Sequence, residues 1–189
     1  MSIIVTFSDN ELAHLDATAA SVSGRRGDRR PNPTFIDGKS TKGGYTQAEA
    51  DYIAMKGEYA VAKLFGLPLE ACDMTQLHVT KPNYDHDLIL PDGRTAQIKA
   101  IKQRTFTTSY PFLFALETTD PNDIKADLGL LALLLPNKYQ VRVPGWFTRE
   151  QFVVWHEIKD LGTGKRAVLP ISKMTPMFAL LNEYQVGVC

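Results

Sequence analysis

The sequence predicts an α/β protein in which helices flank a mixed central β-sheet, and three segments carry this prediction. Residues 46–65 place apolar side chains at helical spacing, residues 84–100 read as two short strands around a tight turn, and residues 124–135 form an apolar run suited to a buried strand. At 189 residues and 44% hydrophobic composition, the chain can bury one sizeable core. We therefore expect a single domain over residues 1–189.

Before the long helix, the chain is expected to form a strand, a helix and a loop. Residues 3–7 alternate weakly between apolar and polar side chains, and Ser8 and Glu11 have the spacing of a capping box that opens a helix to about residue 22. Residues 23–44 are rich in Gly, Pro and Arg, which predicts a flexible basic loop.

Weaker patterns predict the remaining elements. They are a short strand at 77–80, a strand within 105–118, a strand at 139–143, a strand end and then a helix capped by Thr148 at 145–152, and a short helix at 175–184. These elements complete a sheet that carries helices on its surface.

The helix over residues 46–65 carries one acid close to its apolar stripe. Thr46 and Glu49 have capping-box spacing at its start, and Gly66 follows its end. Glu58 lies beside the apolar positions, where a carboxylate needs a cation or hydrogen bonds. Two interpretations stay open: Glu58 lies at the surface, paired with Lys63 or in water at the edge of the stripe, or it is a ligand that the helix delivers to the hairpin.

The hairpin is predicted to have a three-residue loop at residues 92–94, in which Gly93 or Arg94 takes the left-handed conformation. In that register Asp87 lies opposite Lys99. Because side chains alternate along a strand, Gln97 would be the diagonal neighbour of Asp87 on the same face. The other face would hold the apolar residues Leu88, Leu90, Ala96 and Ile98.

A carboxylate, a carboxamide oxygen and a lysine on one patch of sheet can hold a hard cation and position a water beside it. The same alternation is also typical of a hairpin face that is simply washed by solvent. The hairpin alone does not decide between these interpretations, because short motifs match often by chance.

Three short motifs follow one another along the helix and the two strands of the hairpin. Residues 57–62 read Gly-Glu-x-x-Val-Ala on a helix, Asp87 precedes Leu-Ile-Leu, and residues 97–99 read Gln-Ile-Lys on the following strand. This arrangement resembles the PD-(D/E)XK, or restriction-endonuclease-like, nuclease superfamily, over about residues 46–155. In that family a helical Glu, a strand Asp and a Glu-x-Lys or Gln-x-Lys motif occur in this order.

Two departures from the family pattern concern the acids. His86 replaces a proline that often precedes the strand Asp, and Gln97 replaces an acid, as in one branch of the superfamily. The Gln lowers the negative charge offered to a metal. Asp85 is the alternative to Asp87 as the strand ligand, since both alternate onto the same face; we prefer Asp87 because it adjoins the apolar run.

The resemblance implies a restriction-endonuclease-like core and a divalent-metal-dependent endo- or exodeoxyribonuclease. Its metal, Mg²⁺ with Mn²⁺ as a substitute, would be held by Asp87, Glu58, Gln97 and the carbonyl of Ile98. Lys99 would orient the attacking water, so that the catalytic set is Lys99, Asp87, Gln97 and Glu58. A catalytically inactive DNA-binding module of the same fold is the alternative, and a small structural or interaction domain is a third hypothesis.

The charge of the chain is balanced overall but uneven along it. Lys plus Arg and Asp plus Glu both number 21, so no net field draws the protein to nucleic acid. Basic residues gather in residues 23–44 and 93–116, where they suit a phosphate backbone, although charge runs are often only solvated. The predicted nucleic-acid-binding residues are Arg94, Lys102, Arg104, Arg25, Arg26, Arg29 and Arg30.

DNA is therefore the expected partner, in preference to RNA, and the resemblance allows a homodimer. The longest apolar run, at residues 128–135, is far shorter than the roughly 20 residues that span a bilayer. The N-terminus lacks the charged start and long apolar stretch of a signal peptide. The expectation is a cytoplasmic protein that does not act in a membrane.

Overall fold

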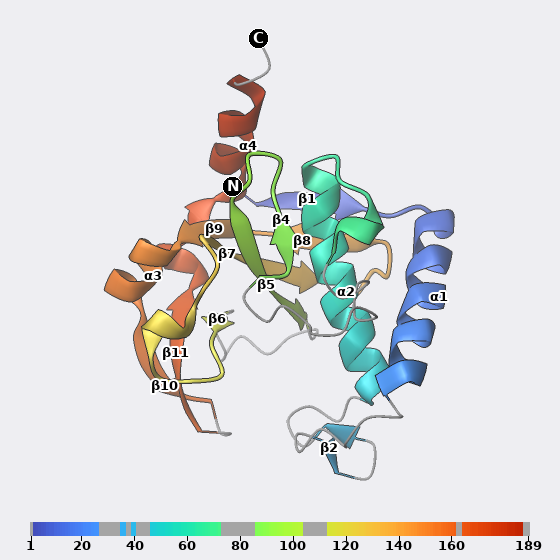
Figure 1. Cartoon of the computed structure of the whole chain (residues 1–189), viewed down its shortest axis with the longest axis horizontal. Coiled ribbons are helices and arrows are strands. Elements are labelled where there is room, and N and C mark those ends of the chain that lie inside the picture. Colours follow the sequence, from blue (N-terminus) through green and yellow to red (C-terminus); the bar gives the residue numbers. More distant parts are fainter. Residues whose placement is uncertain are drawn as a thin grey trace.

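A computed structural model describes residues 2–26, 35–36, 39–40, 46–72, 86–103, 113–161 and 164–186 of the chain. It shows the mixed α/β architecture that the sequence predicts. A large central sheet separates two helices on one side from a smaller sheet and a short helix on the other (Figure 1).

Four helices occur in the described residues: α1 (Asp9–Arg26), α2 (Gln47–Leu64), α3 (Arg149–Trp155) and α4 (Met177–Val186). The large sheet contains β1 (Ile3–Thr6), β4 (Leu88–Ile89), β5 (Thr95–Lys102), β7 (Leu128–Leu134), β8 (Gln140–Val143), β9 (Gly145–Thr148) and β12 (Thr175–Pro176). The smaller sheet contains β6 (Leu113–Ala115), β10 (Glu157–Asp160) and β11 (Lys165–Pro170). A further pair is formed by β2 (Phe35–Ile36) and β3 (Lys39–Ser40).

The large sheet has the order β1-β8-β7-β5-β4, and β5 and β7 are its parallel pair. On its other edge, β7 pairs first with β9 and then with β8, both antiparallel. Leu133 pairs with Arg142 while Leu130 pairs with Trp146, so the partner strand carries one extra residue between these two points. A bulge at Pro144 fits this offset, because proline has no N–H to donate to the ladder.

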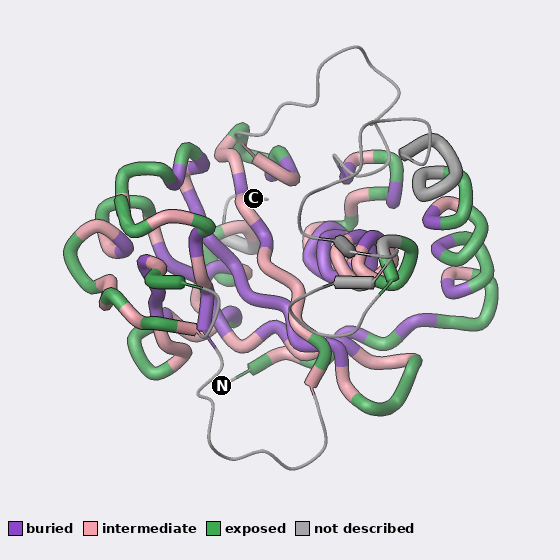
Figure 2. Tube along the Cα trace, turned by 90° about the horizontal axis from the view of Figure 1, so that it is seen from below, coloured by how far each residue is buried: buried purple, intermediate pink, exposed green. Residues whose placement is uncertain are grey.

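Two hydrophobic cores lie on opposite faces of the large sheet. The first packs α1, α2 and α4 against the face that carries Ala96, Ile98 and Leu130. The second packs β6, β11 and α3 against the face that carries Leu131 and Leu133. Figure 2 shows the buried residues running through α2 and the sheet strands between these layers.

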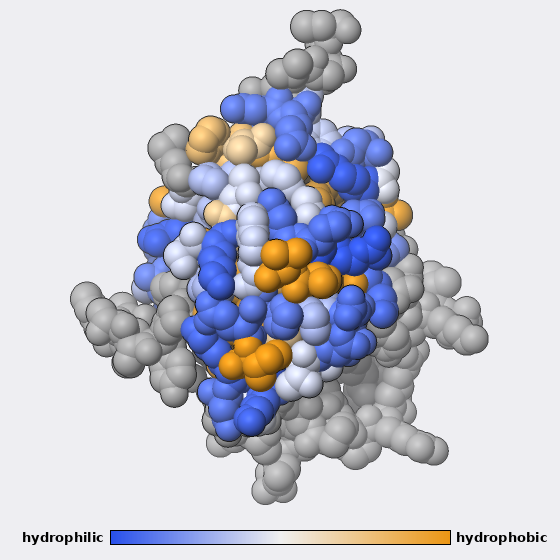
Figure 3. All heavy atoms as spheres, turned by 90° about the vertical axis from the view of Figure 1, so that its left-hand side faces the viewer, coloured by the Kyte–Doolittle hydropathy of each residue, from blue (hydrophilic) through white to orange (hydrophobic). Residues whose placement is uncertain are grey.

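The second core depends on one close packing contact. A Cβ at Gly129 would lie 2.0 Å from the ring of Phe147, so the missing side chain makes room for that ring. Phe147 in turn meets Phe114 edge to face, with ring centroids 4.8 Å apart. The outer surface of this layer, over α3 and β10, carries apolar side chains among polar ones (Figure 3), including Val154, Trp155 and Ile158.

Most of the elements predicted from local pattern are confirmed. Both capping boxes are formed, with Ser8 and Glu11 at the start of α1 and Thr46 and Glu49 at the start of α2. Helix α1 extends to Arg26, past its expected end. The strand pair β2 and β3 lies in the segment expected to be a loop, and β10 and β11 lie where no element was expected. The strand predicted at 77–80 lies outside the described residues.

Among the described helices, none combines the length and the apolar composition that crossing a bilayer would require.

Candidate functional site

The hairpin turn lies one residue earlier than the sequence suggested. Leu90 N donates to Arg94 O at 2.8 Å and Gly93 N donates to Leu90 O at 2.9 Å, so the loop comprises residues 91–93. Gly93 takes the left-handed conformation, with a φ of +87°. The physical reason for the shift is Pro91, whose fixed φ suits the first inner position of a turn and which cannot donate to a strand ladder.

This shift changes the pairing across the hairpin. Leu88 pairs with Ala96, and Asp87 N also donates to Ala96 O at 2.8 Å, so two residues of one strand stand opposite one residue of the other. This is a β-bulge, and bulges re-aim the side chains that they carry. The prediction that Asp87 lies opposite Lys99 is therefore wrong.

The carboxylate of Asp87 marks the point where β4 and β5 separate. Asp87 Oδ2 accepts a hydrogen bond from Ile98 N at 2.6 Å. If β4 were longer, one of its backbone carbonyl oxygens would accept this hydrogen bond instead. The side chain thus replaces a strand partner and holds the acid at the open end of the hairpin. Strand alternation does not continue through the bulge, so Asp87 need not share the face of Gln97 and Lys99.

Helix α2 brings Glu58 to the same sheet. A Cβ at Gly57 would lie 2.4 Å from the Cβ of Ala100, so only glycine allows the helix to pack this closely on β5. Glu58 is the next residue and is only 3% exposed. Of the two interpretations drawn from the sequence, the surface pair is excluded, because Lys63 bonds to Glu11 at 2.6 Å and Glu58 is buried.

Both acids lie close to one buried thiol. The pKa of Cys72 is raised above its ordinary value, first by burial and then by the negative charges of Glu58, Asp87 and Glu70. Cys72 belongs to the core on the α2 side of the sheet. Its surroundings therefore place Glu58 and Asp87 in one region, at the edge where β4 leaves β5.

Gln97 and Lys99 project from the other face of β5. They alternate with Ala96, Ile98 and Ala100, which face α2. Gln97 Oε1 is buried and has no hydrogen-bond partner within the residues that the structure describes. Lys99 is half-buried, and no residue in the described part of the chain forms a hydrogen bond or ion pair with its ammonium.

The structure thus brings the predicted site residues together in two pairs rather than on one face. Glu58 and Asp87 both act on Cys72 on the α2 side, and Gln97 and Lys99 lie on the opposite side of the same strand edge. Asp87 connects the pairs, because its carboxylate bonds the backbone of Ile98, which lies between Gln97 and Lys99.

The donor set suits a hard cation in its chemistry. Carboxylate, carboxamide and carbonyl oxygens are the ligands that Mg²⁺ takes in proteins, and the unpaired oxygen of Gln97 is a buried acceptor that a cation would satisfy. Within the residues that the structure describes, no three His, Cys, Asp or Glu side chains form a metal-binding group. Asp85, the alternative ligand, lies outside those residues.

Two residues were not predicted from the sequence: Cys72, close to the two acids, and the buried acid Asp51 farther along α2. Asp51 is 2% exposed and lies two helical turns before Glu58 on the same side of α2. The signal was present in the sequence, since acids seven residues apart on a helix share a face. Glu70 lies two residues before Cys72, but nothing in the local sequence indicated that Glu58 and Asp87 also act on the thiol.

The structure describes the side chains of only some of the predicted DNA-binding residues. The guanidinium of Arg94 bonds Asp92 at 2.6 Å and Glu183 at 3.0 Å, which ties the hairpin turn to α4. Lys102 is exposed at the end of β5. Arg25 and Arg26 form the last turn of α1, but their side chains lie outside the described part, as do the whole residues Arg29, Arg30 and Arg104.

Comparison with known proteins gives no identity to set beside this geometry: no protein-family model and no curated protein sequence matches the chain.

Proposed function

We propose that this chain is a divalent-metal-dependent nuclease that hydrolyses DNA phosphodiester bonds on a restriction-endonuclease-like core. The observation that carries the proposal is a pair of groups on β5 that have no partner in the described part of the chain, the buried oxygen of Gln97 and the half-buried ammonium of Lys99, beside the bulge at Asp87. Polar groups without protein partners raise the free energy of the fold, and such groups gather at functional sites.

The two acids support the same proposal. Glu58 is only 3% exposed and Asp87 is half-buried, and both carboxylates act on the buried thiol of Cys72 on the α2 side of the sheet, where a cation would offset their negative charge. With the Gln97 oxygen and the Ile98 carbonyl, they would hold Mg²⁺, or Mn²⁺ in its place. A bound Mg²⁺ would lower the pKa of a water and neutralise charge on the scissile phosphate.

Lys99 then has a defined part in the reaction. Its ammonium would hold the attacking water by a hydrogen bond and stabilise the negative charge that develops on the phosphate oxygen. Asp87 would orient that water from the other side, since its second role, bonding Ile98 N, fixes its position. Gln97 contributes an oxygen without adding charge.

A second function is favoured by one observation. Gln97 stands where an acid would bind a metal more tightly, so the chain could keep the fold as a DNA-binding module without the chemistry. Such a module would bind DNA in a salt-sensitive manner that is indifferent to Mg²⁺ and to Asp87→Asn.

The decisive experiment compares the wild type with Lys99→Met and with Lys165→Met, an exposed lysine on β11 that serves as the control. Cleavage of linear duplex, single-stranded, nicked and four-way-branched DNA is measured with Mg²⁺, with Mn²⁺ and with chelator. Lys99→Met should lower the rate by about 100-fold or more, as the loss of a charge-stabilising group does. Its melting temperature should stay unchanged, because the ammonium makes no bond to the described residues.

The preferred substrate would also show whether the enzyme acts at ends, at branches or within duplexes, and a parallel assay with RNA tests the preference for DNA. Full cleavage by Lys99→Met would refute the proposal. If the wild type cuts nothing but binds DNA as well as both variants do, the binding module is the correct function. Sedimentation with and without DNA tests whether the chain forms the homodimer that the resemblance allows.

A further inference from the structure

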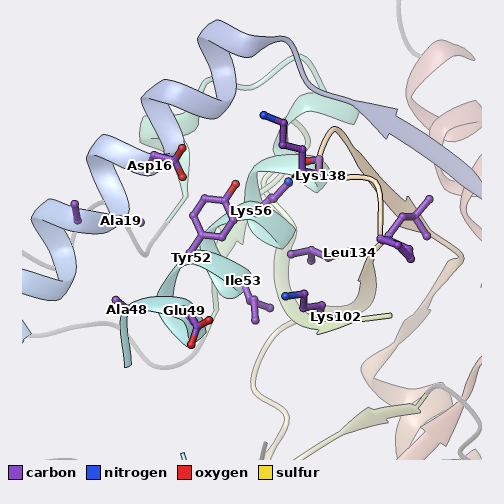
Figure 4. A pocket seen from close by; sticks show the side chains of 13 residues that line it. Asp16, Ala19, Ala48, Glu49, Tyr52, Ile53, Lys56, Lys102, Leu134 and Lys138 are labelled. Carbon is purple, nitrogen blue, oxygen red and sulfur yellow. Dashed lines mark hydrogen bonds between the residues drawn. The ribbon is translucent and has the colours of Figure 1, made fainter. Parts of the chain in front are cut away.

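A cavity of about 520 Å³ opens between α1, α2 and the turn that joins β7 to β8 (Figure 4). It is separate from the predicted metal site, because Glu58, Asp87, Gln97 and Lys99 do not line it. Cavities of this size hold small organic ligands. The walls combine an aromatic ring, aliphatic side chains and three lysines, namely Tyr52, Ile53, Ala19, Leu134, Lys56, Lys102 and Lys138.

Lys56 is the least expected of these residues, since it is only 3% exposed. Its ammonium donates to the carbonyl oxygen of Lys138 and lies 5.5 Å from the ring centroids of Tyr52 and Phe7. An ammonium has three donors, and in the described part of the chain this carbonyl is its one hydrogen-bond acceptor. The remaining donors have no acceptor among the described residues.

Burial lowers the pKa of Lys56, the charge of Lys138 acts in the same direction, and Asp16 acts against them. The protein therefore bears an electrostatic cost for keeping this cation in place. An anion at the cavity wall would relieve the cost.

The acids of the cavity do not cancel its lysines. Glu49 is held by the N–H and hydroxyl of Thr46, at 2.8 and 3.1 Å, as part of the capping box. Asp16 is the other carboxylate, against three ammonium groups. Neither acid forms a hydrogen bond with Lys56 in the described part of the chain, so the Lys56 ammonium suits one anionic group of a ligand.

The shape of the lining indicates the rest of the ligand. Figure 4 shows the Tyr52 ring between Asp16 of α1 and Lys56 of α2, with Ile53 and Leu134 on the side away from α1. A flat apolar group can pack between these side chains while its acid reaches Lys56.

We propose that the cavity between α1 and α2 binds a small organic monocarboxylate with a flat apolar body. The carboxylate accepts hydrogen bonds from Lys56, and the body packs against Tyr52, Ile53 and Leu134. Lys102, a predicted DNA-binding residue, lies on the cavity wall, but none of the predicted metal-binding or catalytic residues does, so the proposal is independent of the proposed cleavage chemistry.

The test uses isothermal titration calorimetry at pH 7 with 2-naphthoate and its neutral isostere 2-naphthamide. The wild type should bind 2-naphthoate about tenfold more tightly or better, the value of one hydrogen bond between charged groups. Lys56→Met keeps the length of the side chain and removes its charge, so it should bind both compounds equally. Lys165→Met should behave as the wild type.

Tyr52→Leu provides a second variant, in which both compounds should bind more weakly by the same factor, because the ring packs against the apolar body and not the acid. The proposal is overturned if the wild type binds neither compound or binds both equally. It is also overturned if Lys56→Met, with an unchanged circular dichroism spectrum, keeps the preference for 2-naphthoate.

Discussion

At the scale of single residues, Glu11 joins three parts of the fold. Its carboxylate accepts hydrogen bonds from Lys63 Nζ at 2.6 Å and from Ser8 N at 2.7 Å, while Lys63 also donates to Thr6 O at 2.9 Å. Burial acts to raise the pKa of Glu11, but these hydrogen bonds outweigh it and lower the pKa from 4.5 to about 2. Glu11 therefore favours the folded state in its ionised form.

Glu11→Gln should lower the free energy of unfolding at pH 7 by about 1 kcal/mol, the net value of a hydrogen bond to a charged group in a partly exposed site. Because the pKa is lower in the folded state, this contribution is complete above pH 4.5 and is lost as the pH falls toward 2. Urea unfolding of both proteins at several pH values measures the difference. Asp123→Asn, at an exposed position, is the control. If the difference in unfolding free energy between the wild type and Glu11→Gln does not become smaller in acid, Glu11 does not stabilise the fold in its ionised form.

At the scale of elements, the contact between α2 and β5 positions the candidate site. Gly57 meets Ala100 where a Cβ would lie 2.4 Å from the facing Cβ, and a third residue, Ala132, would be 3.2 Å away. The helix can approach the strand this closely only because residue 57 has no side chain. Any change in this spacing would also move Glu58, the next residue on the helix.

Gly57→Ala should destabilise the fold by about 1–3 kcal/mol through overpacking. The direction of this change in stability shows whether the helix and the strand are in close contact, because in an unobstructed helix the same substitution stabilises by about 0.5–1 kcal/mol. Thermal unfolding measures the effect, and cleavage should fall together with stability. The double variant Gly57→Ala with Ala100→Gly should recover part of the loss, whereas additive effects would show that the two residues do not meet.

At the scale of the whole molecule, two cores share one sheet, and the candidate site lies at an edge that both cores approach. Glu58 and Asp87 are positioned from the α2 side, while Gln97 and Lys99 project from the other. Bringing these oxygens together requires both layers to be folded. A cation at this edge should therefore bind the native chain and not the unfolded one.

Mg²⁺ should then raise the melting temperature of the wild type by a few degrees. At an ion concentration about tenfold above its dissociation constant, the stabilisation is roughly 1.4 kcal/mol, and about 2–4 °C accompanies each kcal/mol in a chain of this size. Asp87→Asn and Glu58→Gln should lose the shift, and Asp123→Asn should keep it. An equal shift in all four proteins would place the bound ion elsewhere.

Local sequence determined most of the secondary structure. The capping residues Thr46 and Thr148 start α2 and α3, because their side chains accept hydrogen bonds from backbone N–H groups a few positions ahead. The alternation of apolar residues from Leu88 to Ile98 placed their buried face correctly. These features depend on neighbours close in the chain, so a sequence pattern is enough to identify them.

The candidate site was predicted as a set of residues but not as an arrangement. The order Glu58, Asp87, Gln97, Lys99 could be read directly, yet the register of the hairpin was wrong by two residues because Pro91 belongs to the loop. The bulge at Asp87 and the nearness of Glu58 and Asp87 to Cys72 had no local signal.

The sequence by itself thus determined the elements and their buried faces, through propensity, capping and periodicity. The tertiary structure alone decided the parallel pairing of β5 with β7, the smaller sheet behind it, the nearness of Glu58 and Asp87 to Cys72 and the cavity that surrounds Lys56. Each of these joins residues far apart in the chain, and such contacts form only when packing of the whole core repays the entropy of closing the intervening loops.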